Sequence, residues 1–440
     1  MGKYSSLLKT EDWWAVWLGL GIVLVALLSY ALGSTIKPLA VAPPQWADFG
    51  TLNAHFAEAW PRYLLLLIVW LALFTASTRI IGFRARQYMP GFVILFVAST
   101  LILTAGSWKF AKTYNLEPPI LALILGLIVG NLFKIPSWLK TTFRTEYYIK
   151  TGIVLLGATL PLTLIIYAGP TAFFQATIVS LVTFMVIYWA GTRIFRLDRR
   201  FASVLGAGGA VCGVSAAIAS GAATKADKEH ISVTICIVAL WSIVMIFFLT
   251  YASKALNLAP GVAGAWIGTS EFADAAGFAA ASSIGGEVPI YAYTLMKVIG
   301  RDIWIGIWAF VLSIISVVWW EKGSAGARER ISAWVIWERF PKFVIGFAAA
   351  SIIMSFVASS IGPEEFNKAL KPLVIGPVKT LRTWAFVFTF LSIGLTTRFR
   401  ELFQFGWKPI SAFTIGVLVN VPLGYILSTI VFKAHWLAIR

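Results

Sequence analysis

The sequence has little cysteine and little histidine. Its 440 residues contain two cysteines, Cys212 and Cys236, both in apolar stretches, and three histidines that lie far apart. Two such cysteines give no disulfide framework, and scattered histidines give no cluster of the kind that binds zinc or haem. We therefore expect no metal and no cofactor. A membrane-embedded enzyme is also disfavoured, because no nucleophile lies near a base in the sequence.

Charged residues are scarce as well, at 12% of the chain, whereas 59% of the residues are hydrophobic. No stretch is both polar enough and long enough to form a separate soluble domain. This composition predicts an all-α polytopic membrane protein. The net charge of +17 does not indicate nucleic-acid binding, because the basic residues lie in loops, where the positive-inside rule places them in membrane proteins.

Apolar stretches of about 20 residues, the length that spans a bilayer, recur along the whole chain. We expect about 11–13 transmembrane segments. The first follows Glu11 and Asp12, and its apolar run is too long for a signal peptide, so we expect a retained anchor helix. The candidate segments are 13–33, 62–82, 91–108, 118–134, 150–168, 172–192, 202–222, 231–252, 262–283, 302–320, 341–361, 383–397 and 410–432.

Loops rich in basic residues alternate with loops that have few. The loop 34–61 carries only Lys37, for example, whereas the loop 193–200 carries four arginines. This alternation predicts a cytoplasmic N-terminus. The setting that we expect is the bacterial inner membrane.

A short motif occurs twice, as Leu156-Gly-Ala-Thr-Leu160 and as Ile393-Gly-Leu-Thr-Thr397. The segment count runs the first copy outward and the second inward, which is typical of the inverted repeats of secondary transporters. We expect an extra N-terminal helix and loop (1–61), a first five-helix inverted repeat (62–200), glycine-rich connecting segments (201–260) and a second inverted repeat (261–440).

The two copies also read as interruptions of their helices. Two broken helices that cross near the membrane midplane would place opposed half-helix ends around one site. The hydroxyl groups of Thr159, Thr396 and Thr397 would then face that site. By contrast, the pair Gly126-xxx-Gly130 favours plain helix packing.

Four of the eight residues from Gly206 to Gly213, in the seventh segment, are glycines. Glycine costs about 1 kcal/mol in a helix interior, so this density predicts broken or closely packed backbone. A helix beginning there would direct free N–H groups at an anion. Small-residue packing between helices is the alternative, and no sheet surrounds the glycines as in a dinucleotide site. The candidate substrate-binding residues are Gly208, Gly209, Cys212, Gly213 and Ser215.

Two acidic residues, Glu271 and Asp274, follow Thr269 and Ser270 in the ninth segment. They share one helical face, and carboxylates inside a membrane are costly and functional by default. We expect them to couple or gate transport, and the two hydroxyl residues to bind substrate. The alternative is that the acids cap a half-helix near a membrane surface.

A third cluster of charged residues comprises Lys297, Arg301 and Asp302. Lys297 and Arg301 are four residues apart and so share a helix face. They could neutralise the two acids of the ninth segment or attract an anion. The alternative is a solvated face at the membrane edge.

The chain resembles the YeiH-type family of sulfate exporters from about Leu121 onward. The resemblance is carried by Gly126-Leu-Ile-Val-Gly-Asn131, Gly152-Ile-Val-Leu-Leu-Gly157, Gly206-Ala-Gly-Gly-Ala-Val-Cys-Gly213, Ile267-Gly-Thr-Ser270 and Gly394-Leu-Thr-Thr397. It implies a fold like that of bile-acid symporters and sodium/proton antiporters, with crossed broken helices, and export of a small oxyanion. Many members have a His–acid pair after the segment-nine glycine. Here Phe272 and Ala273 take those positions.

The leading hypothesis is a secondary transporter that exports a small oxyanion, sulfate or a sulfonate, by alternating access. Its partners would be the anion, the lipid bilayer and a coupled proton or sodium ion. One alternative is a cation-coupled organic-anion symporter or antiporter, with Glu271 and Asp274 as ion ligands. A passive anion channel is a further alternative. Related folds include homodimers, although no feature of this sequence indicates one.

Overall fold

The computed structural model describes residues 7, 9–113, 118–160, 162–320, 341–361, 363–397 and 406–439. The chain divides into two compact units. Unit 1 comprises Met1–Ile165 and Lys342–Thr397, and unit 2 comprises Ile166–Pro341 and Arg398–Arg440. The described residues contain helices and no strand, apart from an isolated bridge between Trp46 and Trp108.

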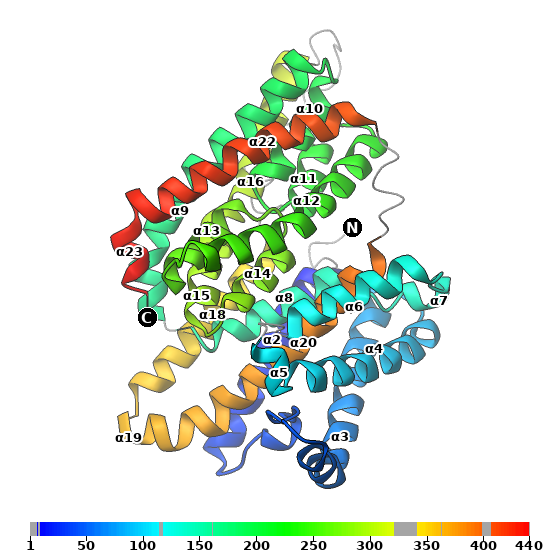
Figure 1. Cartoon of the computed structure of the whole chain (residues 1–440), viewed down its shortest axis with the longest axis vertical. Helices are drawn as coiled ribbons and strands as arrows, with labels where there is room; N and C mark the ends of the chain where they lie inside the picture. The colour runs from blue at the N-terminus through cyan, green and yellow to red at the C-terminus, as the bar shows by residue number, and fades with distance from the viewer. Residues whose placement is uncertain are drawn as a thin grey trace. The chain divides into compact units, whose positions relative to one another are not determined.

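Unit 1 is built around α20, which packs along α6 and α8, and Figure 1 shows α20 and α6 side by side. The N-terminal helix α2 lies against α8 and α18 in the same unit. The elements of unit 1 are α2 (Glu11–Ala31), η1 (Lys37–Leu39), α3 (Phe49–Ile81), α4 (Ala85–Gly106), α5 (Lys109–Thr113), α6 (Pro118–Leu132), α7 (Ser137–Lys140), α8 (Thr145–Gly157), α18 (Lys342–Ser359), α19 (Pro363–Glu365), η5 (Phe366–Ile375) and α20 (Gly376–Thr396).

Unit 2 contains two pairs of short helices that follow one another along the chain, α10 with α11 and α13 with α14. Its elements are α9 (Leu162–Trp189, of which the first turn lies in unit 1), η2 (Ala190–Ile194), α10 (Arg199–Ala210), α11 (Val214–Thr224), α12 (Lys228–Ala255), α13 (Pro260–Ser270), α14 (Asp274–Ile284), α15 (Val288–Thr294), η3 (Leu295–Arg301), α16 (Trp304–Ile315), η4 (Ser316–Trp320), α22 (Trp407–Ile426), η6 (Leu427–Val431) and α23 (Lys433–Leu437).

The long helices α9 and α22 of unit 2 run antiparallel. Asn420 donates to the Thr183 hydroxyl over 2.8 Å. Gln175, eight residues before Thr183, donates over 2.9 Å to the hydroxyl of Ser428, which lies eight residues after Asn420 in η6, the continuation of α22. The partner numbers fall on one helix as they rise on the other, which defines the antiparallel direction. All four side chains are buried, so these hydrogen bonds hold the register of the pair in an apolar setting.

Nine helices of the described residues are long and apolar enough to cross a membrane. Many of their apolar side chains are exposed, as suits helices that face lipid rather than water. The prediction of an all-α, multi-pass membrane protein is therefore confirmed. The assignment of residues to two inverted repeats stays a prediction.

The second copy of the repeated motif lies in the last turn of α20, which runs unbroken from Gly376 to Thr396. The chain leaves the helix at Thr397 and residues 398–405 lie outside the described residues, so an interruption at this point stays a prediction. Gly394 allows close packing: a Cβ atom on it would lie 2.6 Å from the Leu123 carbonyl oxygen of α6. Gly126 faces α20 in return, since a Cβ atom on it would lie 2.8 Å from the Leu391 carbonyl oxygen, as the packing interpretation of the Gly126-xxx-Gly130 pair predicted.

Candidate functional site

The first interruption in unit 2 separates α10 from α11. The link is Val211–Gly213, and its backbone leaves the helical region: Val211 has φ −123° and ψ −103°, and Gly213 has φ +71°. A left-handed φ favours glycine, which has no Cβ atom to clash with the backbone. The glycine-rich stretch after Gly206 therefore forms a broken helix, as its composition predicted.

The second interruption separates α13 from α14. The link is Glu271–Ala273, in which Glu271 and Ala273 have extended backbone. The Glu271 carboxylate folds back over this link and accepts hydrogen bonds from the N–H groups of Phe272, at 2.8 Å, and Ala273, at 3.3 Å. Glu271 is fully buried, and its carboxyl group lies at the N-terminal end of α14, where the helix dipole favours a negative charge.

The two links touch, so unit 2 contains a pair of broken helices that cross at their interruptions. An ideal Cβ atom on Gly213 would lie 2.8 Å from the carbonyl oxygen of Phe272. We call the contact between the links Val211–Gly213 and Glu271–Ala273 the crossing. At the crossing, α10 and α13 present C-terminal carbonyl groups and α11 and α14 present N-terminal N–H groups.

Two basic side chains from the π-helical turn η3 cap the C-terminal ends at the crossing. The Lys297 ammonium donates to the carbonyl oxygens of Val211, at 2.6 Å, and Glu271, at 3.0 Å. Arg301 donates to five carbonyl oxygens drawn from both broken helices. They belong to Gly209 (3.2 Å), Ala210 (3.3 Å), Gly268 (3.1 Å), Thr269 (2.7 Å) and Glu271 (2.9 Å).

Lys297 and Arg301 are fully buried, so the alternative of a solvated face at the membrane edge is wrong. Lys297 also lies 3.8 Å from an Asp274 carboxylate oxygen, as expected if the basic pair neutralises the acids of the ninth segment. A buried charge is costly unless paired and hydrogen-bonded, and both conditions are met here.

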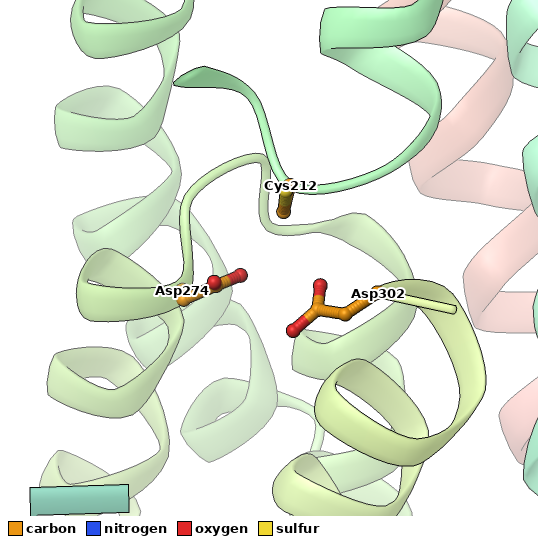
Figure 2. Close-up of side chains that lie close together, drawn as sticks. All are labelled: Cys212, Asp274 and Asp302. Atoms are coloured by element: carbon orange, nitrogen blue, oxygen red, sulfur yellow. The ribbon is translucent and has the colours of Figure 1, made fainter. Parts of the chain in front are cut away.

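Cys212, Asp274 and Asp302 gather beside the crossing. One thiol or carboxylate atom from each lies within 4.8 Å of the other two. Figure 2 shows the three side chains facing one space, from the α10–α11 link, the start of α14 and the residue after η3. The prediction of no metal-binding residues missed this grouping, because the three residues are far apart in sequence.

A thiol and two carboxylates so close could in principle hold a cation. However, the Lys297 ammonium already stands 3.8 Å from Asp274, and the Arg301 guanidinium lies on the neighbouring carbonyl oxygens. Two resident positive charges repel a divalent ion at this distance. The geometry therefore favours a group that carries one positive charge at most.

The other predicted residues of the broken helices differ in burial and in their place along the helices. Ser215 lies half-buried in the first turn of α11, where it could reach a ligand at the helix N-terminus. Gly208 and Gly209 lie inside α10 and pack closely, with Gly208 against Thr234 and Gly209 against Phe413. Thr269 and Ser270 are fully buried in the last turn of α13, and Gly424 of α22 packs against their hydroxyl groups.

The hydroxyl residues of the repeated motif lie in unit 1, whereas the crossing belongs to unit 2. Thr396 and Thr397 donate to the Ser392 and Ile393 carbonyl oxygens of their own helix, at 2.7 and 2.8 Å. Thr159 accepts a hydrogen bond of 3.1 Å from Arg382 and donates to the Leu156 carbonyl oxygen. The broken helices that meet at the crossing therefore do not include these three threonines.

The sequence places Asp302 in one cluster with Lys297 and Arg301 but predicts no site role for it. It is fully buried and completes the charged group at the crossing. Its position directly after Arg301 was a usable signal, since an intramembrane carboxylate is costly unless it has a role.

The polar groups at the crossing contrast with an apolar cavity of about 380 Å³ in unit 1, lined by residues such as Trp17, Leu66 and Trp70.

Comparisons with known proteins agree with the motif resemblance. A family model described as conserved hypothetical protein 698 matches residues 90–412. A UPF0324 membrane protein of Rhodopirellula baltica is 34% identical over 409 residues, which cover 92% of this chain and 74% of the relative. A UPF0324 membrane protein of Nitratidesulfovibrio vulgaris is 32% identical over 378 residues, 84% of this chain and 64% of that longer relative. One of Nitrosomonas europaea is 30% identical over 488 aligned residues, covering 99% and 96% of the two chains. No solved structure matches the chain.

Proposed function

The chain belongs to the conserved hypothetical protein 698 family of membrane proteins, and we propose that it is a secondary active transporter of a small oxyanion. The substrate would be sulfate or a sulfonate, exported across the bacterial inner membrane with the N-terminus in the cytoplasm. The observation that carries the proposal is the crossing in unit 2, where two broken helices meet around buried charges. Discontinuous helices of this kind form the substrate and ion sites of many secondary transporters.

The N-terminal end of α11 is the best placed anion site at the crossing. Its first turn holds the half-buried Ser215 and follows the left-handed Gly213, so backbone N–H groups and a hydroxyl group face the same end of the helix. Helix N-termini bind anions through these groups and the helix dipole. The corresponding N–H groups before α14 already donate to Glu271, so we assign the anion to α11.

A cation-coupled symporter or antiporter is the second candidate, and the buried acids favour it. Glu271 and Asp302 are fully buried in unit 2, and Asp274 lies beside Lys297. Carboxylates at membrane depth mark ion pathways and proton relays. The two candidates are compatible, because a coupled ion can drive the movement of an anion.

Transport by purified protein in liposomes tests the proposal. With the membrane potential held at zero by equal potassium concentrations and valinomycin, vesicles loaded with unlabelled sulfate or a sulfonate should accumulate the labelled anion from outside by exchange. A passive channel gives no accumulation under these conditions. We expect Ser215→Ala to slow exchange about tenfold, because a hydrogen bond to a charged group contributes about 1.5–3 kcal/mol.

The matched control is Ser220→Ala in the same helix. Ser220 is buried and donates to the Ala216 carbonyl oxygen of its own helix, away from the helix end. Its loss should leave exchange unchanged. Absence of exchange for both sulfate and the sulfonate would refute the proposal. Equal exchange rates for Ser215→Ala and the unaltered protein would contradict the assignment of the anion site to the N-terminal end of α11.

A further inference from the structure

The carbonyl oxygens at the crossing are the groups that a transported sodium ion would need. In transporters with broken helices, unwound carbonyl groups and half-helix C-terminal ends coordinate the cation. Here the corresponding oxygens of α10, α13 and their links accept hydrogen bonds from Lys297 and Arg301. An ammonium and a guanidinium group therefore occupy the place of a coordinated metal cation.

Among the described side chains at the crossing, the acids outnumber these two bases. Three carboxylates, Glu271, Asp274 and Asp302, lie with two bases, so the group carries one excess negative charge when all five are ionised. The four half-helix ends do not alter this sum, because two N-terminal and two C-terminal ends have opposite partial charges. A net charge away from water is costly, so one further positive charge is favoured.

The position of that positive charge follows from the neighbours of each acid. Glu271 is held by two backbone N–H groups. Asp274 and Asp302 instead share a space with the Cys212 thiol, and two carboxylates this close do not both ionise readily. Among the described residues, the other titratable groups beside them are Lys297 and Arg301 of η3 and Tyr293 of α15, whose hydroxyl donates to the Asp274 carbonyl oxygen over 2.8 Å.

We propose that Lys297 and Arg301 are resident cations at the crossing, and that the coupling ion is a single proton bound between Asp274 and Asp302. The inference deepens the proposed transport function and rests on it. In this scheme the proton adds to one carboxylate oxygen and leaves the same pair on the other side of the membrane. The carbonyl oxygens at the crossing are taken by Lys297 and Arg301, so in this scheme transport depends on pH and not on sodium.

Thermal unfolding of the purified full-length protein in detergent tests the resident cations. The unfolding midpoint of the unaltered protein should be the same in sodium chloride and in choline chloride at equal ionic strength. Lys297→Ala vacates the carbonyl oxygens of Val211 and Glu271 and adds one negative charge to the excess. Sodium should then raise the midpoint of this variant by at least about 2 °C, because a ligand that binds only the folded state stabilises it.

The control variant is Lys433→Ala, which removes an exposed basic residue of unit 2 and should give no sodium response. Sodium stabilisation of the unaltered protein would overturn the proposal. A folded Lys297→Ala variant that ignores sodium would overturn it too.

A pH series on Asp302→Asn tests the proton even if Lys297→Ala does not fold. The folded pair holds one proton that the unfolded chain has lost, so the midpoint of the unaltered protein should fall between about pH 6 and pH 8. Asp302→Asn should lose at least half of this fall, and an unchanged slope would reject the shared proton. The liposome assay distinguishes this proposal from the proposed function. If the protein exchanges anions but its stability does not depend on pH, it is a transporter without the shared proton. If its stability depends on pH but it exchanges no anion, the shared proton stands and the proposed transport function fails.

Discussion

Gly213 and Phe272 hold the two broken helices together through a contact that leaves no room for a side chain. An ideal Cβ atom on Gly213 would stand 2.8 Å from the Phe272 carbonyl oxygen, and the φ of +71° at Gly213 is already unfavourable for other residues. Close approach and backbone conformation therefore demand glycine at the same position. The link that breaks α10–α11 also sets how near α13–α14 can come.

Gly213→Ala should accordingly lower the free energy of unfolding by more than its backbone strain alone. The strained φ costs about 1–3 kcal/mol, and the clash with Phe272 adds about 1–3 kcal/mol. Gly285→Ala is the matched control, because Gly285 also has a positive φ, of +102°, but nothing within 4 Å of its Cβ position. Chemical or thermal unfolding of both variants in detergent measures the difference. Equal losses for the two would contradict a close contact at the crossing.

In unit 1, the N-terminal helix α2 is joined to α8 by the ion pair Asp12–Lys150, with 2.7 Å between the charged atoms. Asp12→Asn should destabilise unit 1 by about 1–3 kcal/mol, since Lys150 is then left largely buried beside one acid, Glu146, instead of two. The control is Glu364→Gln, which breaks the pair with Lys368 on the surface, where both side chains are more than three-quarters exposed. That change should cost less than about 0.5 kcal/mol. A similar loss in both variants would show that the Asp12 pair does not anchor α2.

The antiparallel pair α9–α22 makes a separate prediction. Gln175 donates to the Ser428 hydroxyl and accepts a hydrogen bond of 2.8 Å from the Trp436 indole. Gln175→Leu leaves the indole N–H buried without its partner, which should cost about 1–3 kcal/mol. Combination with Ser428→Ala in a double-mutant cycle should give a coupling energy of about 0.5–1.5 kcal/mol.

Thr177→Val is the control for that cycle. Thr177 is two residues away on α9, and its hydroxyl donates only within its own helix, to the Phe173 carbonyl oxygen. We expect its change and that of Ser428 to be additive. Additive losses for Gln175 and Ser428 as well would mean that the hydrogen bond between the helices contributes nothing measurable.

The glycine-rich break was predictable from the sequence for a local reason. Four glycines in eight residues penalise a continuous helix whatever surrounds them, so the interruption near Gly213 follows from composition alone. The charge of Glu271 gave a similar local signal for the second break, because a carboxylate in an apolar segment needs donors, and the N–H groups of an interrupted helix supply them.

The partners at the crossing were not predictable in the same way. Gly394 and Gly213 look alike in sequence, yet Gly394 serves a close approach of α6 to an unbroken helix, and only three-dimensional packing separates the two cases. Gly157 has a role like that of Gly394, since it packs against the Phe347 carbonyl group of α18. The glycines of the two copies of the motif thus share a packing role. Asp302 and Cys212 meet only because their segments fold together.

Arg301 gives the sharpest prediction for the integrity of the crossing, because it alone donates to carbonyl oxygens of both α10 and α13 among the described residues. Arg301→Lys keeps the charge but loses the planar group that reaches five oxygens at once. It should lower the free energy of unfolding by about 2–4 kcal/mol, since hydrogen bonds from charged groups contribute about 1.5–3 kcal/mol each and are not additive.

The control for this change is Arg200→Lys, because Arg200 is only half-buried and donates to the Lys225 carbonyl oxygen, at 3.1 Å, outside the crossing. Its loss should be below about 0.5 kcal/mol. If Arg301→Lys were as mild, the C-terminal ends of the broken helices would not depend on a guanidinium group. A large loss in Arg301→Lys that Arg200→Lys does not share would instead show that charge alone is insufficient, and that the geometry of the cap keeps the two broken helices crossed.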